Sequence, residues 1–252
     1  MDKIRKKYYS LVKKFHKLET DISEHGIHEK RVILSKLIPI ISVQKTKNIN
    51  HRKKIFSLMG KLRNIQIQIQ ILIMKSTETY PGISDYITYL DKKELKFGHK
   101  IRKFFKKHKI VFPKITLEQN ICIARIKSQT VHSYNRIRQT VLSNNEYNAV
   151  TMHKIRKELK VFRYGIETIS LEKSIDDEVF DQLKEYQDKL GEIQDYRILI
   201  ENINVYKRKK RCVNPVNTTE FDIYLKKLID NFSSDIDAFL SVCEQTTRIA
   251  VE

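Results

Sequence analysis

The sequence contains no tryptophan, six glycines, four prolines and three cysteines in 252 residues. An all-β protein needs turn residues roughly every 8–12 positions, so this scarcity of glycine and proline argues against that class. The cysteines, at positions 122, 212 and 243, are odd in number and widely spaced, which favours neither a disulfide framework nor a CxxC metal site. We therefore expect reduced thiols in a cytoplasmic protein.

Long apolar runs are also missing. No stretch approaches the roughly 18 apolar residues of a membrane-spanning helix, and the lysine-rich N-terminus lacks the apolar segment of a signal peptide. The chain has no GxxxxGK[ST], GxGxxG, HExxH or Glu-x-Glu-x-Lys motif. We therefore expect a protein that is neither inserted in a membrane nor exported, and that is not an enzyme and has no cofactor or metal.

The chain is rich in positive charge. It has 49 Lys and Arg against 30 Asp and Glu, which gives a formal net charge of +19. The excess lies in residues 1–114, whereas the two signs balance in residues 115–252. A field of this size attracts polyanions such as nucleic acid, polyphosphate or an anionic membrane surface, and by itself does not select one of them.

The segment Met152–Glu167 and the residues just after it carry two stripes at helical spacing. One stripe is apolar and consists of Ile155, Leu159, Phe162, Ile166 and Ile169. The other is basic and consists of His153, Arg156, Lys160 and Arg163. The stripes lie roughly 120° apart around a helix, so one face can pack into a core while the other presents cations. The pattern fits either an anion-binding surface or an ordinary solvated face.

A second copy of this pattern favours the anion-binding interpretation. His28 and Arg31 repeat the His-x-x-Arg spacing 125 residues earlier. Each copy is followed by a Leu- or Met-Gly element, around Gly60 in the first half and Gly191 in the second. A glycine within a helix costs about 1 kcal/mol relative to alanine, so we expect a neighbouring helix to approach both glycines closely. The chain therefore looks internally duplicated, with halves of about 126 residues.

Three further segments need interpretation. Ile65–Ile71 alternates with glutamine at a strand's period of two, yet its flanks keep helical spacing, so we predict one helix over residues 50–77. The final helix is predicted to begin at Asn217 and to continue through Leu240. A third helix, over residues 83–108, carries lysines within roughly an 80° arc, which either bind an anion or form a solvated face. These lysines are Lys92, Lys96, Lys100, Lys103 and Lys107.

The second-half residues resemble the CHAD family, the conserved histidine α-helical domain. The resemblance is carried by His153, Arg156, Lys160, Arg163, Tyr164 and Glu167, followed by Leu183, Gln187, Leu190, Gly191 and Asp195. In the first half, Ser35 stands where the family usually has an arginine and Asn64 where it usually has an aspartate, with Lys36 beside Ser35. The resemblance covers essentially the whole chain. It implies an all-α fold of two pseudo-symmetric four-helix bundles, which we place at residues 1–114 and 115–252.

The resemblance also implies non-catalytic binding of inorganic polyphosphate in a basic groove between the bundles, with possible association with polyphosphate granules. The expected polyphosphate-binding residues are His28, Arg31, Lys36, Arg63, Lys92, Lys96, Lys100, Lys103, His153, Arg156, Lys157, Lys160, Arg163 and Arg197. A nucleic-acid-binding helical protein is the alternative. It is less favoured because the basic stripe carries no row of aromatic residues for base stacking and no groove-reading motif is present. A third interpretation is that the protein is a small enzyme acting on phosphoanhydrides.

Several individual roles stay open at this stage. His28 and His153 could pack, contact an anion as pH-tuned groups, or less readily bind a metal, since no second ligand stands at metal-binding spacing beside either. Asp195 and Glu167 could act as an acid and a base. We expect instead that they pair with or orient neighbouring arginines, because a carboxylate fixes the geometry of a guanidinium.

Overall fold

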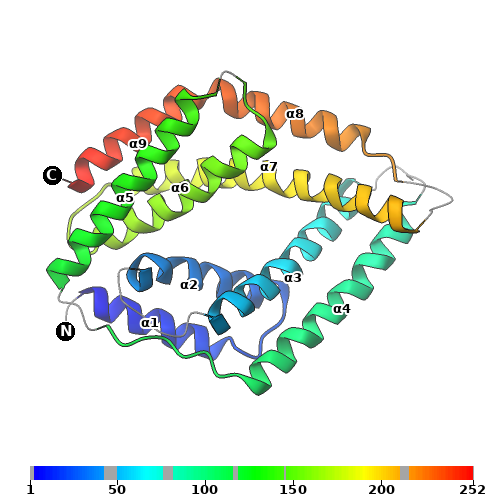
Figure 1. The fold of residues 1–252 in the computed structure, drawn as a ribbon, viewed down its shortest axis with the longest axis horizontal. Helices are drawn as coiled ribbons and strands as arrows, with labels where there is room; N and C mark the ends of the chain where they lie inside the picture. The colour runs from blue at the N-terminus through cyan, green and yellow to red at the C-terminus, as the bar shows by residue number, and fades with distance from the viewer. Residues whose placement is uncertain are drawn as a thin grey trace.

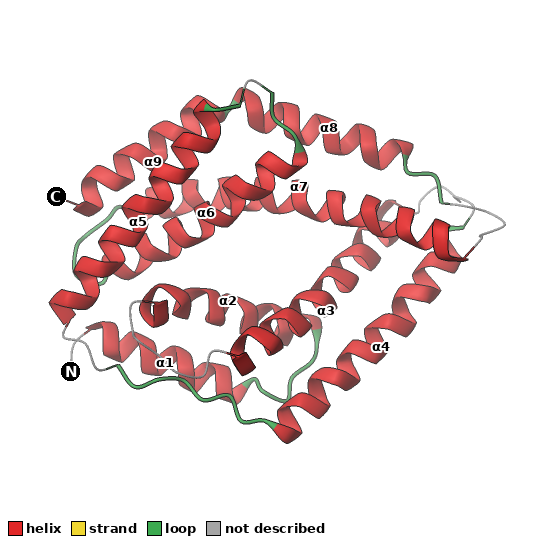
Figure 2. Ribbon diagram, viewed as in Figure 1, coloured by secondary structure: helices red, strands yellow, loops and turns green. Residues whose placement is uncertain are grey.

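Every regular element in the described part of the chain is an α-helix (Figures 1 and 2). The computed structural model describes residues 3–42, 50–75, 82–115, 119–144, 146–210 and 216–251. Within these ranges the helices are α1 (Lys3–Lys17), α2 (Glu24–Ser42), α3 (Asn50–Lys75), α4 (Ile83–Lys107), α5 (Gln119–Leu142), α6 (Ala149–Ile169), α7 (Asp177–Lys210), α8 (Thr219–Ser234) and α9 (Ile236–Val251). The predicted all-α class is confirmed for these residues.

Helices that follow one another in sequence also pack side by side. In the first half α1 contacts α2, α2 contacts α3 and α3 contacts α4, and in the second half α5, α6, α7 and α8 repeat this order. The halves are joined by contacts of α2 with α5 and α6 and by contacts of α3 with α7. Figure 1 shows α6 and α7 crossing the middle of the molecule, with α5, α8 and α9 on one side and α1 to α4 on the other. The four helices that carry the duplicated motifs thus meet at the centre.

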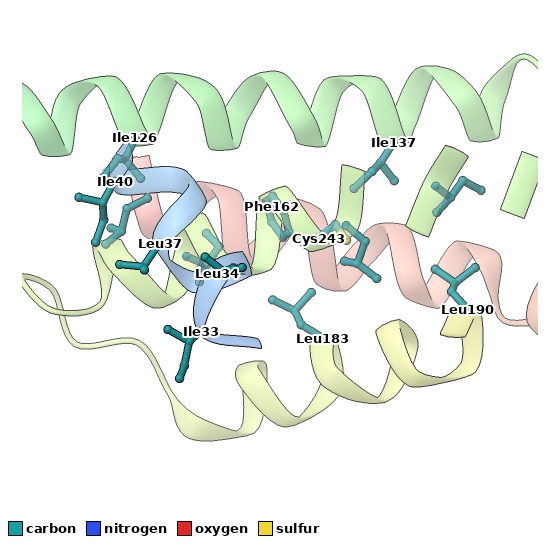
Figure 3. Packing of buried hydrophobic residues seen from close by; sticks show 14 of the residues in the cluster. Ile33, Leu34, Leu37, Ile40, Ile126, Ile137, Phe162, Leu183, Leu190 and Cys243 are labelled. Carbon is teal, nitrogen blue, oxygen red and sulfur yellow. The ribbon is translucent and has the colours of Figure 1, made fainter. Parts of the chain in front are cut away.

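The buried apolar side chains form two clusters, and burial of such side chains is the main force that holds the helices together. The larger cluster draws on both halves, and Figure 3 shows Leu37 of α2, Phe162 of α6 and Leu183 of α7 within it. The smaller cluster joins α3 and α4 to α7 and α8, for example through Leu72 and Leu199. Both clusters therefore contain residues from both sides of the division at residues 114 and 115. The placement of that division stays a prediction.

The predicted helix over the alternating Ile-Gln segment is confirmed. Residues 65–71 lie inside α3, which runs without a break from Asn50 to Lys75, and the predicted last two residues lie outside the described ranges. The spacing of Ile55, Leu62 and Leu72, each at most 1% exposed, follows the helical period. Packing of this face outweighs the strand preference of isoleucine.

The prediction of one final helix through Leu240 is wrong. The helix stops at Ser234, where the amide of Asp235 donates to the carbonyl of Phe232 over 3.2 Å, and α9 begins at Ile236. Phe232 and Phe239, on opposite sides of this break, are both buried and their ring centroids lie 5.5 Å apart. The break lets α9 fold back onto α5 and α7.

Two other expectations concern membranes and cysteines. In the ranges that the structure describes, no helix combines the length and the apolar content that crossing a membrane requires. Cys122 and Cys243 are buried, and burial raises the pKa of the Cys243 thiol. Cys212 lies outside the described residues.

Candidate functional site

A pocket of about 460 Å³ opens where α2, α3, α6 and α7 meet. Five of the predicted binding residues line it: His28 and Arg31 from α2, Arg63 from α3, and Arg156 and Lys160 from α6. Residues that are more than 120 positions apart in sequence are therefore neighbours here. The two copies of the His-x-x-Arg pattern contribute both of their arginines to one pocket.

The two glycines of the duplicated elements lie beside these arginines. A Cβ atom built on Gly60 of α3 would lie 2.5 Å from Nη1 of Arg31. A Cβ atom built on Gly191 of α7 would lie 4.0 Å from Nε of Arg156. The expected close approach of a neighbouring helix therefore occurs at Gly60, through a side chain of α2, and not at Gly191, where the nearest atom is at an ordinary contact distance. The neighbour in both places is an arginine side chain, and Gly60 leaves room for the guanidinium against the backbone of α3.

Lys160 is a half-buried cation with other cations around it. Burial and then the charges of Arg156, Arg31 and Arg163 together lower the pKa of its ammonium group to about 8. No carboxylate in the described part of the chain forms an ion pair with Lys160 or with Arg156, and Nε of Arg156 is buried without a hydrogen-bond acceptor there. The positive charges of Lys160 and Arg156 therefore lie in a partly desolvated site where carboxylates of the protein do not fully neutralise them.

Arg31 of α2 is likewise a half-buried cation with other cations near it. Its guanidinium lies over the ring of Phe56, 5.0 Å from the centroid, which holds the side chain in place. Burial lowers the pKa of Arg31 to about 10, and the charges of Arg156 and Arg63 act in the same direction. The opposing influence comes from Asp195 on α7.

Asp195 is the carboxylate at the centre of this cluster. Burial raises its pKa to about 6, while the charges of Arg156, Arg63 and Arg31 act in the opposite direction. This carboxylate faces arginines from three helices and lies in the pocket lining, which fits the expected role of orienting arginines. Asn64, its counterpart in the first half, also lines the pocket and adds no charge.

Other predicted cations are already held by carboxylates. Nη1 of Arg63 donates to Oε1 of Glu24 over 2.5 Å, and this hydrogen bond lowers the pKa of Glu24. Glu167 of α6 accepts from Arg163 at 3.1 Å and pairs with Lys36 of α2 at 3.1 Å. The prediction that Glu167 pairs with neighbouring cations is confirmed. The pair with Arg163 lies within α6, and the pair with Lys36 joins α2 to α6.

The histidines of the two copies differ in position. His28 lines the pocket, and burial together with the charge of Arg63 lowers its pKa. His153, Lys157 and Arg197 do not line it. Burial and then the charge of Arg197 lower the pKa of His153, and Arg197 itself pairs with Glu201 at 2.5 Å. These three residues form a small basic group beside the pocket.

The lysine stripe of α4 lies elsewhere. Lys92, Lys96, Lys100 and Lys103 are all exposed, and none of them lines the pocket. Lys100 lies over the ring of Phe97 on its own helix, 5.2 Å from the centroid. The structure therefore does not bring this part of the predicted groove to the site where the arginines meet.

Sequence reasoning also missed part of the lining. Asp188 and Glu192 precede Asp195 on α7 at steps of four and three, a helical spacing that could have placed them on the same face. Val32, Ile67 and Ile71 form an apolar part of the wall, on α2 and α3. No group of three or more histidine, cysteine, aspartate or glutamate side chains suited to a metal ion occurs within the described ranges.

Two comparisons relate this chain to known proteins. The family model for the CHAD domain matches residues 124–204, which include all of α6 and most of α5 and α7. The chain is also similar in structure to the CHAD domain from the plant Ricinus communis, known from a crystal structure. The TM-score is 0.65 at 11% sequence identity, and the match covers 96% of this chain and 89% of that chain. At this identity the similarity establishes the fold.

A search among curated proteins found no significant match to the sequence. The family match nevertheless contains Arg156, Lys160 and Asp195, which are central to the pocket. Sequence and fold thus lead to the same family: residues 124–204 match the model of the CHAD domain, and the fold of the chain is similar to that of a CHAD domain.

Proposed function

We propose that this protein binds linear inorganic polyphosphate, without catalysis, in the basic pocket formed by α2, α3, α6 and α7. The observation that carries the proposal is the group of cations around the pocket, of which Arg156 and Lys160 form no ion pair within the described ranges. Burying like charges together is unfavourable unless an anion neutralises them. A polyphosphate chain supplies that neutralising charge.

The proposed duplication explains why the pocket has two similar walls. We infer that the chain consists of two related four-helix bundles, residues 1–114 and 115–252, with α9 added at the end. Arg31 beside Gly60 and Arg156 beside Gly191 support this, as do the contacts of α2 with α6 and of α3 with α7. The groove between the bundles would then be the place where the two basic helices face each other.

The cations differ in what they offer a phosphate. Arg31, Arg63 and Arg156 present planar guanidinium groups that can donate two hydrogen bonds to one phosphate, whereas Lys160 acts as a compact charge. His28 lines the same pocket and gains a proton more readily when a phosphate lies near it. Lys36 and Arg163 would contribute by giving up their ion pairs with Glu167 and binding phosphate oxygens instead.

The remaining predicted residues have a supporting role in this proposal. His153, Lys157 and Arg197 would extend the basic surface at one end, and the lysines of α4 would attract the polyanion over a longer range. Long-range attraction of this kind is screened beyond about 8 Å at physiological salt. The same surface would let the protein associate with polyphosphate granules.

The proposal is tested by measuring the affinity of the full chain for long-chain polyphosphate by isothermal titration calorimetry at about 0.15 M salt. Reversing charge at Arg156 and Arg163 should weaken binding far more than reversing charge at Lys3 and Lys6, which lie on α1 outside the pocket. Equal losses in the two double variants would mean diffuse attraction by net charge and would overturn the assignment of the pocket.

Two further measurements separate the alternatives. Duplex DNA or RNA should fail to displace polyphosphate at the same salt concentration, and displacement would favour a nucleic-acid-binding protein instead. Release of phosphate from polyphosphate in the presence of Mg²⁺ would establish an enzyme. We expect no release.

A further inference from the structure

The pocket contains a wall that an inorganic phosphate chain does not use. Ile67 and Ile71 of α3 and Val32 of α2 are half-buried and line it beside the arginines, and Met74 of α3, which is 78% exposed, lies at the same side. Inorganic polyphosphate has no apolar surface to place against these side chains. An apolar wall next to a phosphate site is typical of pockets for organic ligands.

The opposite wall, on α7, carries hydrogen-bond acceptors. Asp188 and Glu192 are both exposed and line the pocket, and Glu192 accepts a hydrogen bond from Tyr224 over 3.0 Å. A carboxylate repels phosphate oxygens but accepts hydrogen bonds from hydroxyl and amino groups. These two residues therefore suit a part of a ligand that carries donors and no negative charge.

We propose that the pocket binds a nucleoside polyphosphate, with the phosphates at the arginines and the nucleoside between the apolar wall and α7. The proposal rests on the polyphosphate function above for its anionic part and adds the nucleoside as the preferred end group. The base would pack on Ile67 and Ile71, while Asp188 and Glu192 would accept from ribose hydroxyls or from an amino group of the base. The pocket volume of 460 Å³ lies within the range of roughly 300–1,000 Å³ that is usual for small-molecule sites.

The first test compares two ligands that have three phosphates each. The affinities of the full chain for ATP and for inorganic tripolyphosphate are measured by isothermal titration calorimetry in the same buffer, at the same salt and with EDTA present. ATP should bind about tenfold more tightly, because only ATP can use the apolar wall and the carboxylates. Equal affinities, or tighter binding of tripolyphosphate, would overturn the proposal.

The second test uses a variant of the apolar wall and a matched control. Ile67→Gln keeps a good helix former in α3 and should weaken ATP binding about fivefold while changing tripolyphosphate affinity less than about twofold. Leu95→Gln makes the same kind of change on α4 at a side chain that is 71% exposed and outside the pocket, and should alter neither affinity. If Ile67→Gln weakens both ligands equally, or neither, the wall does not hold a nucleoside.

The two proposals fail in different ways. If long-chain polyphosphate binds and Arg156→Glu abolishes that binding, the polyphosphate function stands whatever ATP does. If ATP then binds no better than tripolyphosphate, only the nucleoside site is refuted. If Arg156→Glu leaves both ligands unaffected, the phosphate site itself is misplaced and both proposals fall.

Discussion

The cations of the pocket and the lysines of α4 have similar sequence patterns but different surroundings in the structure. Both sets recur at helical spacing and both lie in a chain of net charge +19, so they look equivalent in sequence. In the structure Lys160 and the pocket arginines are half-buried close to one another, whereas Lys96 and Lys100 are exposed to solvent. Charges in water are screened and interact weakly, whereas charges in a partly buried site interact strongly.

Burial therefore decides which basic stripe can act as a site. The repulsion among Arg31, Arg156 and Lys160 is present in the folded protein before any ligand arrives, and a bound anion removes it. The α4 lysines gain little from one bound anion because water already solvates them. The comparison predicts that the two stripes respond very differently to the same substitutions.

The largest expected difference comes from charge reversal. Arg156→Glu should weaken polyphosphate binding by about a hundredfold or more, because it removes a half-buried cation and places a carboxylate beside the ligand. The double variant Lys96→Glu and Lys100→Glu reverses twice as many charges on α4 and should weaken binding less than about threefold at physiological salt. Calorimetric titrations of both variants provide the measurement.

The opposite order of the two losses would contradict the assignment of the pocket. A larger loss in the α4 variant would place the polyphosphate on the exposed lysines and would make the pocket a structural feature. Circular dichroism of both variants would show whether each is still folded, so that a loss of binding is assigned to the site itself.

A second, smaller effect separates binding from stability. Lys160→Met keeps the long aliphatic side chain but removes a half-buried charge that three arginines repel. We expect about tenfold weaker polyphosphate binding together with a gain in unfolding free energy of about 1–2 kcal/mol, which urea denaturation can measure. Lys100→Met on α4 should change both quantities little. A loss of stability in Lys160→Met would contradict the claim that the pocket charges repel one another.

A third effect concerns pH and has opposite signs for stability and for binding. The pKa of Lys160 is lowered from its ordinary 10.5 to about 8, so the folded protein releases this proton as the pH rises through 8 while the unfolded chain keeps it. The unfolding free energy should therefore rise between about pH 8 and 10.5 through this residue, since the unfolded state then binds more protons. Affinity for polyphosphate should fall over the start of this window, by up to about fivefold between pH 7 and 9.

Lys160→Arg is the control for this pH dependence. An arginine keeps its charge throughout the window, so the fall in affinity between pH 7 and 9 should become small. A pH profile identical to that of the unchanged protein would assign the fall to another group.

The sequence was informative about helices and about one wall of the site. Helical spacing predicted α3 despite its Ile-Gln alternation, and the His-x-x-Arg spacing predicted that Arg31 and Arg156 belong together. Both predictions depend on local periodicity, which a single segment contains in full. The pairing of Glu167 with neighbouring cations was also foreseeable, because Arg163 stands one helical turn before it.

Sequence reasoning failed where distant segments decide the outcome. Whether the lysines of α4 reach the pocket depends on how α3 and α4 lie against α7, and no local pattern specifies that. The break at Asp235 depends on the packing of Phe232 and Phe239, and a continuous helical period hides it. The mixed lining of the pocket, with Ile67 opposite Asp188, likewise appears only once four helices are assembled.

The smallest expected effect compares the two glycines of the duplicated elements. Replacing a helical glycine by alanine usually stabilises a helix by about 1 kcal/mol. At Gly191 the nearest atom, Nε of Arg156, would lie 4.0 Å from the added Cβ, which is an ordinary contact. Gly191→Ala should therefore raise the unfolding free energy by close to that amount and leave polyphosphate affinity unchanged.

At Gly60 the added Cβ would lie 2.5 Å from Nη1 of Arg31, so the guanidinium must move. The end of a long side chain can shift, but this one is held over the ring of Phe56 and faces the pocket. Gly60→Ala should thus gain less stability than Gly191→Ala and weaken polyphosphate binding about twofold to threefold. Urea denaturation and calorimetry on the two variants make the comparison, and equal behaviour would mean that the position of Arg31 does not matter for the ligand.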